Sequence, residues 1–230
     1  MYRYKANPDA ISLGQICKLS QSLGLPLTNG AMWTQDSIVG SERRRLQLES
    51  ELAKNNGTRL ITIPAYTVND ELPEITRLLL QEDYGAEAKQ LEDEVLRIRA
   101  ERQQLYEVAK YESWEIWNGY GYSDFLNGLG RYRSIPTELR EAQIEKFVAN
   151  AARPNVHRFV YLTHSPELPM FGCHTPPGIV LVRVDDIHLE FQDRDLIRSF
   201  AETFDSLRRS SATSTLEQFA TFLRKGRLDQ

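Results

Sequence analysis

The sequence predicts an α/β protein of the α+β kind, in which helices pack on a mixed, mostly antiparallel sheet. Short β-branched runs at residues 60–64 and 156–163 indicate strands. Longer stretches with apolar residues three and four positions apart, such as residues 86–110, indicate helices. A small helical head and a charged helix come first in the chain, and the composition changes after the charged helix, near residue 57. We therefore expect a head at residues 1–33, a linker helix at residues 34–57 and an α/β body at residues 58–230.

The head and the linker are both expected to be helical. In residues 10–24 the apolar side chains recur on one face, and Gly24 ends the helix. Residues 35–56 also follow a helical pattern, are rich in charge and stop at Gly57. A charged helix between two parts of different composition is typical of a linker.

The body alternates strand and helix patterns, which favours one mixed domain. Residues 111–117 alternate with period two, so we expect a strand, although they could instead continue the preceding helix. The runs 178–184 and 187–191 indicate a hairpin that turns at Asp185-Asp186. The remaining expected elements are a strand at 60–64, helices at 70–82, 86–110 and 136–151, a strand at 156–163, and two closing helices that contain Phe200 and Phe219.

Length, charge and cysteine content limit the class of protein. The chain has 230 residues and a formal net charge of −4. A protein that grips nucleic-acid phosphates over its whole surface is usually basic, so any such contact should be local. Cys17 and Cys173 are too few for a disulfide framework, which fits a reducing compartment. Without a secretory signal or a run of about 18 apolar residues, we expect a cytoplasmic protein that does not contact membranes.

The longest helical stretch, residues 86–110, offers a contact surface. Its apolar positions are spaced alternately by three and four residues, which is close to a heptad seam. Arg102 stands where another apolar residue is expected. The stretch is either an amphipathic helix that packs on its own domain or the seam of a homodimer. We expect a homodimer, with its seam at Leu91, Val95, Ile98 and Leu105.

The beginning of the chain carries a family resemblance. Residues 2–26 contain an aromatic and basic opening, a polar loop with Pro8, and an apolar helix that ends at Leu23-Gly24. This order resembles the second half of a lambda-repressor-like (Cro/C1-type, XRE family) helix-turn-helix domain. The resemblance implies a transcriptional regulator whose DNA-binding module is truncated, so that DNA is bound only if the missing first helices are supplied. The residues expected to contact DNA are Tyr2, Arg3, Tyr4 and Lys5.

An aromatic cluster marks the candidate ligand site of the body. Two tryptophans three residues apart precede a Gly-Tyr-Gly-Tyr run, and aromatic side chains beside glycine can line an apolar pocket. The alternative is that they form ordinary core. Neighbouring arginines could pair with an anionic ligand. The expected ligand-binding residues are Trp114, Trp117, Tyr122, Arg131 and Arg133.

Two further groups of residues could suggest metal chemistry. Asp185 and Asp186 belong to an acidic cluster that could hold Mg²⁺, but Asp-Asp is also ordinary turn chemistry. Asp193 in the same cluster is placed to cap the next helix. Cys173 and His174 are adjacent, and this spacing matches no zinc pattern. We therefore expect no metal site, no cofactor and no catalytic residues.

Together these patterns favour a transcriptional-regulator-like protein with an incomplete DNA-binding module and an α/β domain that senses a ligand or a partner. A small molecule or a protein is then the expected effector. One alternative is a non-catalytic protein-interaction domain that uses residues 86–110 as its surface. The other alternative is a metal-dependent enzyme that acts on a nucleotide or nucleic acid through Asp185 and Asp186.

Overall fold

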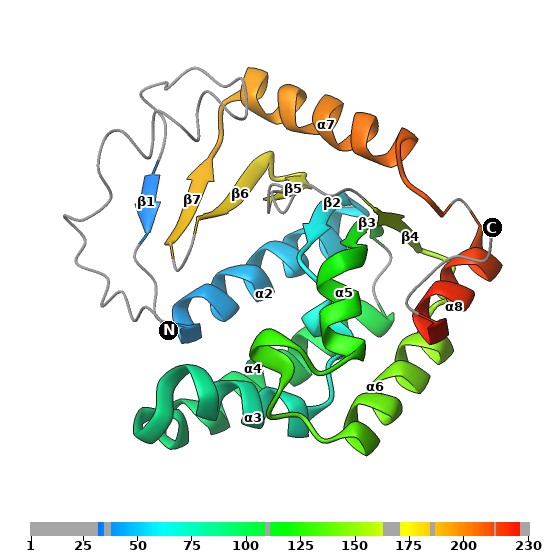
Figure 1. The fold of residues 1–230 in the computed structure, drawn as a ribbon. Coiled ribbons are helices and arrows are strands. Elements are labelled where there is room, and N and C mark those ends of the chain that lie inside the picture. The colour runs from blue at the N-terminus through cyan, green and yellow to red at the C-terminus, as the bar shows by residue number, and fades with distance from the viewer. Residues whose placement is uncertain are drawn as a thin grey trace.

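A single mixed sheet organises the chain (Figure 1). The computed structural model describes residues 32–34, 38–108, 111–162, 171–184, 187–213 and 215–225. The strands are β1 (Met32–Thr34), β2 (Thr58–Ile63), β3 (Glu112–Asn118), β4 (Val156–Tyr161), β5 (Phe171–Thr175), β6 (Ile179–Val184) and β7 (Ile187–Phe191). The helices are α2 (Ile38–Asn55), α3 (Pro73–Tyr84), α4 (Ala88–Val108), α5 (Gly119–Leu126), α6 (Thr137–Asn150), α7 (Arg194–Arg209) and α8 (Leu216–Lys225), with short 3₁₀ helices η2 (Val68–Asp70), η3 (Gly85–Glu87) and η4 (Gly130–Tyr132).

The sheet confirms the expected fold class. Its strand order is β1-β7-β6-β5-β2-β3-β4. The pairs β2–β3 and β3–β4 are parallel, and the other described pairs are antiparallel. The chain crosses from β2 to β3 through α3 and α4 and from β3 to β4 through α5 and α6, as parallel strands require. The sheet is therefore mixed and mostly antiparallel, and residues 112–118 form a strand instead of continuing the helix.

The hairpin expected near the end of the sheet is also confirmed. Strands β6 and β7 pair antiparallel up to Val184 and Ile187, whereas Asp185 and Asp186 lie outside the described residues. Strand β5 was not expected, because Gly172 and His174 lack the β-branched pattern of an isolated strand. It forms because β2 and β6 pair with it on both sides.

Helices cover the two faces of the sheet unequally. Among the described helices, α7 alone lies on one face, and the others lie on the opposite side (Figure 1). Alternate residues of each strand point to opposite faces. In β2, Leu60 packs in the cluster under α7, whereas Ile61 and Ile63 pack in the aromatic cluster on the other face. In β3, Trp114 and Trp117 are divided in the same way.

The expected homodimer seam on α4 is wrong. Val95 and Ile98 are fully buried within the chain, in a cluster with Val39 of α2 and Leu80 of α3. The helix therefore packs on its own domain, which was the alternative interpretation of the stripe. The boundary placed at residue 57 stays a prediction, although α2 packs along α4 and contributes to buried clusters of the body.

The head cannot be compared with the structure. The helix-turn-helix resemblance at residues 2–26, with Tyr2, Arg3, Tyr4 and Lys5, lies outside the described residues. None of the helices in the described ranges is long and apolar enough to cross a membrane.

Candidate functional site

Two of the expected ligand-binding residues lie in the densest part of the core. Trp117 and Tyr122 are completely buried, with ring centroids 5.8 Å apart. Phe147 and Phe219 meet the Trp117 ring edge-on at 5.3 and 5.2 Å. The Tyr122 hydroxyl donates a hydrogen bond to the Leu223 carbonyl at 2.7 Å. A ligand between Trp117 and Tyr122 would have to displace these contacts.

The expected anion-binding arginines lie apart from that core. Arg131, in η4, is exposed and pairs with Asp83 at 2.9 Å. Arg133 is also exposed. Trp114 lies on the opposite face of the sheet from Trp117, because an odd spacing in a strand separates two side chains. The structure therefore brings Trp117 and Tyr122 together but does not gather all five expected residues around one cavity.

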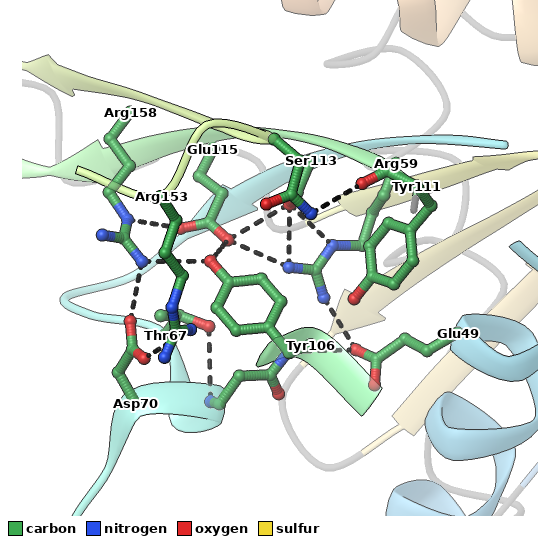
Figure 2. A network of polar contacts seen from close by, with 12 residues as sticks. Glu49, Arg59, Thr67, Asp70, Tyr106, Tyr111, Ser113, Glu115, Arg153 and Arg158 are labelled. Atoms are coloured by element: carbon green, nitrogen blue, oxygen red, sulfur yellow. Dashed lines mark hydrogen bonds and ion pairs between the residues drawn. The ribbon is translucent and has the colours of Figure 1, made fainter. Parts of the chain in front are cut away.

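A buried network of charged residues lies beneath the helices on the Trp117 face (Figure 2). It explains the residue that interrupts the apolar stripe of α4. Arg102 is only 3% exposed and donates two hydrogen bonds of 2.9 Å to Glu49 of α2. It also donates a hydrogen bond to Glu42, which Arg99 approaches to 3.1 Å. The polar exception in the stripe thus attaches α4 to α2.

The network continues from α2 into the sheet. Arg59 of β2 lies between Glu49, at 2.7 Å, and Glu115 of β3, at 2.9 Å. Glu115 accepts further hydrogen bonds from Tyr106 at 2.7 Å and from Arg158 of β4 at 3.3 Å. The side chains of Arg59, Glu115 and Arg158 meet because these residues lie opposite or diagonally opposite one another on the same face of neighbouring strands.

A fourth carboxylate, Asp70, closes the network at η2. Asp70 is completely buried and accepts hydrogen bonds from Arg158 at 2.7 Å, Arg153 at 3.1 Å and Asn150 at 2.9 Å. Figure 2 shows the Asp70, Arg153 and Arg158 side chains converging beside the Tyr106 ring. The network therefore connects α2, α4, η2 and three neighbouring strands through paired charges.

Burial and ion pairing oppose each other in setting the pKa values of this network. Burial alone would raise the pKa of Glu49, but Arg102 and Arg59 outweigh it and lower the pKa to about 2. For Asp70, burial outweighs Arg158 and Arg153, and the pKa is raised. Burial, assisted by Arg59, lowers the pKa of His174 to about 4. At neutral pH Glu49 is therefore ionised and His174 is neutral.

The contacts in the network favour a structural role. Each of its carboxylates is held by arginines, so the charges compensate one another inside the protein. Two buried polar atoms beside it, the Tyr111 hydroxyl and Asn69 Oδ1, have no hydrogen-bond partner among the described residues. The network therefore holds elements in register through paired charges.

The acidic cluster near β7 is also engaged in structural contacts. Glu190 accepts two hydrogen bonds from Arg44, at 2.6 and 2.9 Å. Asp193 caps α7 through the amides of Asp195 and Leu196, at 2.9 and 3.0 Å, as its position in the sequence indicated. No group of three or more His, Cys, Asp or Glu side chains in the described ranges could hold a metal ion.

Cys173 and His174, neighbours in β5, lie on opposite faces of the sheet. Cys173 packs in the cluster under α7, and His174 pairs in register with Arg59 on the network face. Neighbouring residues of a strand point to opposite faces, so these two side chains cannot bind one ion together.

A surface groove lies between α7 and the neighbouring strands. Its volume is about 380 Å³. Trp114 is partly exposed there, and its ring stacks on His157 with centroids 4.1 Å apart. The Arg208 guanidinium lies 5.7 Å from the Trp114 ring centroid and 3.0 Å from Asp205. The groove is lined by Leu60, Trp114, Arg198, Ala201, Glu202, Phe204, Asp205 and Arg208.

Sequence reasoning found one residue of this groove and missed the rest. Trp114 was singled out with the aromatic cluster, and the expected arginine neighbour was sought at Arg131 or Arg133. Arg208 takes that place instead, from a helix almost a hundred residues further along the chain. The sequence contains no local signal for this pairing, because β3 and α7 meet only through the tertiary fold.

Comparisons with known proteins identify no family. No protein-family model matches the chain, and none of the curated proteins matches it. Among solved structures, the chain is similar to TrmBL2, an archaeal chromatin protein whose structure shows a novel mode of DNA binding. The identity is 10%, the TM-score is 0.38, and the match covers 84% of this chain and 57% of TrmBL2. The chain thus spans little more than half of that protein's length, and this likeness is too distant to carry an argument about function.

Proposed function

We propose that this chain is a transcriptional-regulator-like protein. Residues 2–26 contribute to a helix-turn-helix module, and the α/β body senses a small molecule or a partner. The resemblance at residues 2–26 supports the first part. The groove beside Trp114 carries the second part, because it is a concave surface with an apolar floor and charged side chains at its rim.

The state of the charged residues supports binding instead of catalysis. In the described body, the buried carboxylates contact arginines, and Glu190 and Asp193 make structural contacts. The groove residues, in contrast, are accessible from solvent at Arg198 and Glu202. A homodimer belongs to this proposal as well, with its contact surface elsewhere than on the buried stripe of α4.

DNA titration tests the proposed function. We expect the chain as it stands to bind duplex DNA weakly and with a shallow salt dependence, because it makes few phosphate contacts. A chain extended by the first helices of a helix-turn-helix domain should bind tightly, with a steeper dependence on salt, when fluorescence anisotropy of labelled DNA is measured. Tight, sequence-selective binding by the chain without this extension would contradict the first expectation. Absence of binding by the extended chain would contradict the regulator.

A protein-interaction domain is the second candidate. The observation that favours it is the charged side of α7 along the groove, where two acidic side chains, Glu202 and Asp205, lie between two basic ones, Arg198 and Arg208. The molar mass in solution, measured by light scattering, tests the regulator, because a regulator of this class commonly binds symmetric sites as a dimer. A protein that stays monomeric at high concentration would contradict the homodimer.

A further inference from the structure

The groove beside α7 has the size and the floor of a small-ligand site. Its volume of about 380 Å³ falls in the range of roughly 300–1,000 Å³ that such sites occupy. The floor is formed by Leu60, Trp114 and Phe204, which come from β2, β3 and α7. Leu60 and Trp114 are partly exposed, so apolar surface is accessible at the bottom of the groove.

The rim of the groove carries both signs of charge. Arg198 and Arg208 are the two cations, and Glu202 and Asp205 are the two anions, all on α7. Arg208 and Asp205 lie 3.0 Å apart, with side chains 35% and 50% exposed. The formal charge of the rim is therefore zero, and opposite charges lie next to each other above an apolar floor.

We propose that this groove binds a free amino acid with a large apolar or aromatic side chain. An α-amino acid carries its ammonium and its carboxylate on one carbon, so its two charges are adjacent, like those of Asp205 and Arg208. The ammonium pairs with Asp205 or Glu202, the carboxylate pairs with an arginine, and the side chain covers Trp114. The inference rests on the proposed function in taking this groove as the sensing site of the body.

Charge complementarity selects this class over ligands with one charge. A simple carboxylate would approach Arg208 but would also face Asp205 and Glu202, and like charges at a contact are unfavourable. A simple amine would face Arg198 and Arg208 in the same way. A zwitterion leaves each charge with an opposite partner. The ion pair that it displaces is partly exposed, and such pairs contribute little to stability.

Calorimetric titration of the whole chain tests the ligand class. The probes are L-phenylalanine, L-leucine and glycine, with phenethylamine and 3-phenylpropionate as analogues that lack one charge. We expect the two large amino acids to bind. Glycine should bind more weakly because it cannot cover the floor, and each analogue should bind about two- to fivefold more weakly because one partly exposed ionic contact is missing. Absence of binding by both large amino acids overturns the proposal, and so does an analogue that binds as tightly as phenylalanine.

Two variants test whether the ligand binds in the groove. Arg208→Gln and Asp205→Asn remove the charge but keep a polar side chain, and each should weaken phenylalanine binding by about two- to fivefold. Arg131→Gln is the matched control, because Arg131 is also part of an exposed ion pair but lies outside the groove. Circular dichroism checks that all three variants fold. An unchanged affinity in Arg208→Gln and Asp205→Asn, or equal losses in the control, overturns the assignment.

The result is distinguishable from the test of the proposed function. If the chain binds amino acids but its extended form does not bind DNA, the proposed regulator is contradicted and the amino-acid site in the groove is supported. DNA binding by the extended chain without any amino-acid binding would remove only the inference about the groove.

Discussion

Replacing Arg102 with methionine should strongly destabilise the fold while leaving the shape of α4 intact. Methionine keeps a long, flexible side chain and a high helix propensity, so the change removes mainly the charge and the hydrogen bonds. Arg102 donates three hydrogen bonds to carboxylates, two to Glu49 and one to Glu42. Both glutamates are almost completely buried, so water cannot replace the lost partner.

The expected loss in the free energy of unfolding follows from removing one partner of a buried ion pair. Such a change costs about 3–5 kcal/mol, because the remaining carboxylates stay buried with too little positive charge. Glu42 keeps Arg99 and Glu49 keeps Arg59, so we expect the lower part of that range. Against a total stability of about 5–15 kcal/mol for a domain, this is a large fraction.

Urea denaturation at neutral pH measures the effect. The control is Arg97→Met on the same helix, where the arginine is 59% exposed and pairs with the exposed Glu101 one turn away. Its loss should shift the free energy of unfolding by at most about 0.5 kcal/mol. If Arg102→Met cost less than about 1 kcal/mol, or no more than the control, the paired and buried network would be refuted.

The pH dependence provides a second check on the same variant. The pKa of Glu49 lies at about 2 in the folded chain, against an ordinary value of 4.5. The stabilisation from this lowered pKa is present above pH 4.5 and is lost as the pH falls toward 2. Arg102→Met removes part of it, so the difference between wild type and variant should narrow below pH 4.5.

Three further predictions concern single residues elsewhere in the fold. The pKa of His174 lies at about 4 in the folded chain, against an ordinary value of 6.5, so burial of its neutral form stabilises the fold above pH 6.5, and the free energy of unfolding should fall by on the order of 2–3 kcal/mol as the pH drops to 4. Urea denaturation at several pH values should show a weaker pH dependence of this free energy in His174→Phe, and an equal pH dependence would argue against a buried neutral histidine. Gly121→Ala should lower the midpoint of thermal unfolding, because a Cβ there would lie 1.9 Å from the Pro64 carbonyl oxygen, and an unchanged midpoint would count against that close approach. Trp117→Ala should lower the free energy of unfolding in urea by about 3–5 kcal/mol, and Trp114→Ala should lower it clearly less because Trp114 is partly exposed. The opposite order would contradict the burial of Trp117 and the exposure of Trp114.

The sequence alone determined most of the elements of the body. Apolar residues with helical spacing marked α2, α4, α6 and α7, and β-branched runs marked β2, β4 and β6, because burial of one face imposes a period on each element. The position of Asp193 before α7 identified a cap, because that contact is made within one turn of chain. Signals of this kind depend on residues close together in sequence.

The tertiary structure alone decided what those elements contact. Arg102 was visible in the sequence as an exception to the stripe, but its partners Glu42 and Glu49 lie on a helix about fifty to sixty residues earlier. The tryptophans looked like one cluster, whereas the strand places Trp114 and Trp117 on opposite faces. An odd spacing within the strand separates the two rings, so they do not line one pocket.

The groove shows why a site of this kind escapes sequence reasoning. Its floor and rim come from β2, β3 and α7, which are distant in the chain and meet only because the strand order brings β2 and β3 under α7. Periodicity records which side of an element is buried, but it does not record which element covers it. That information lies in long-range packing, where each contact depends on the whole set of strand pairings being formed.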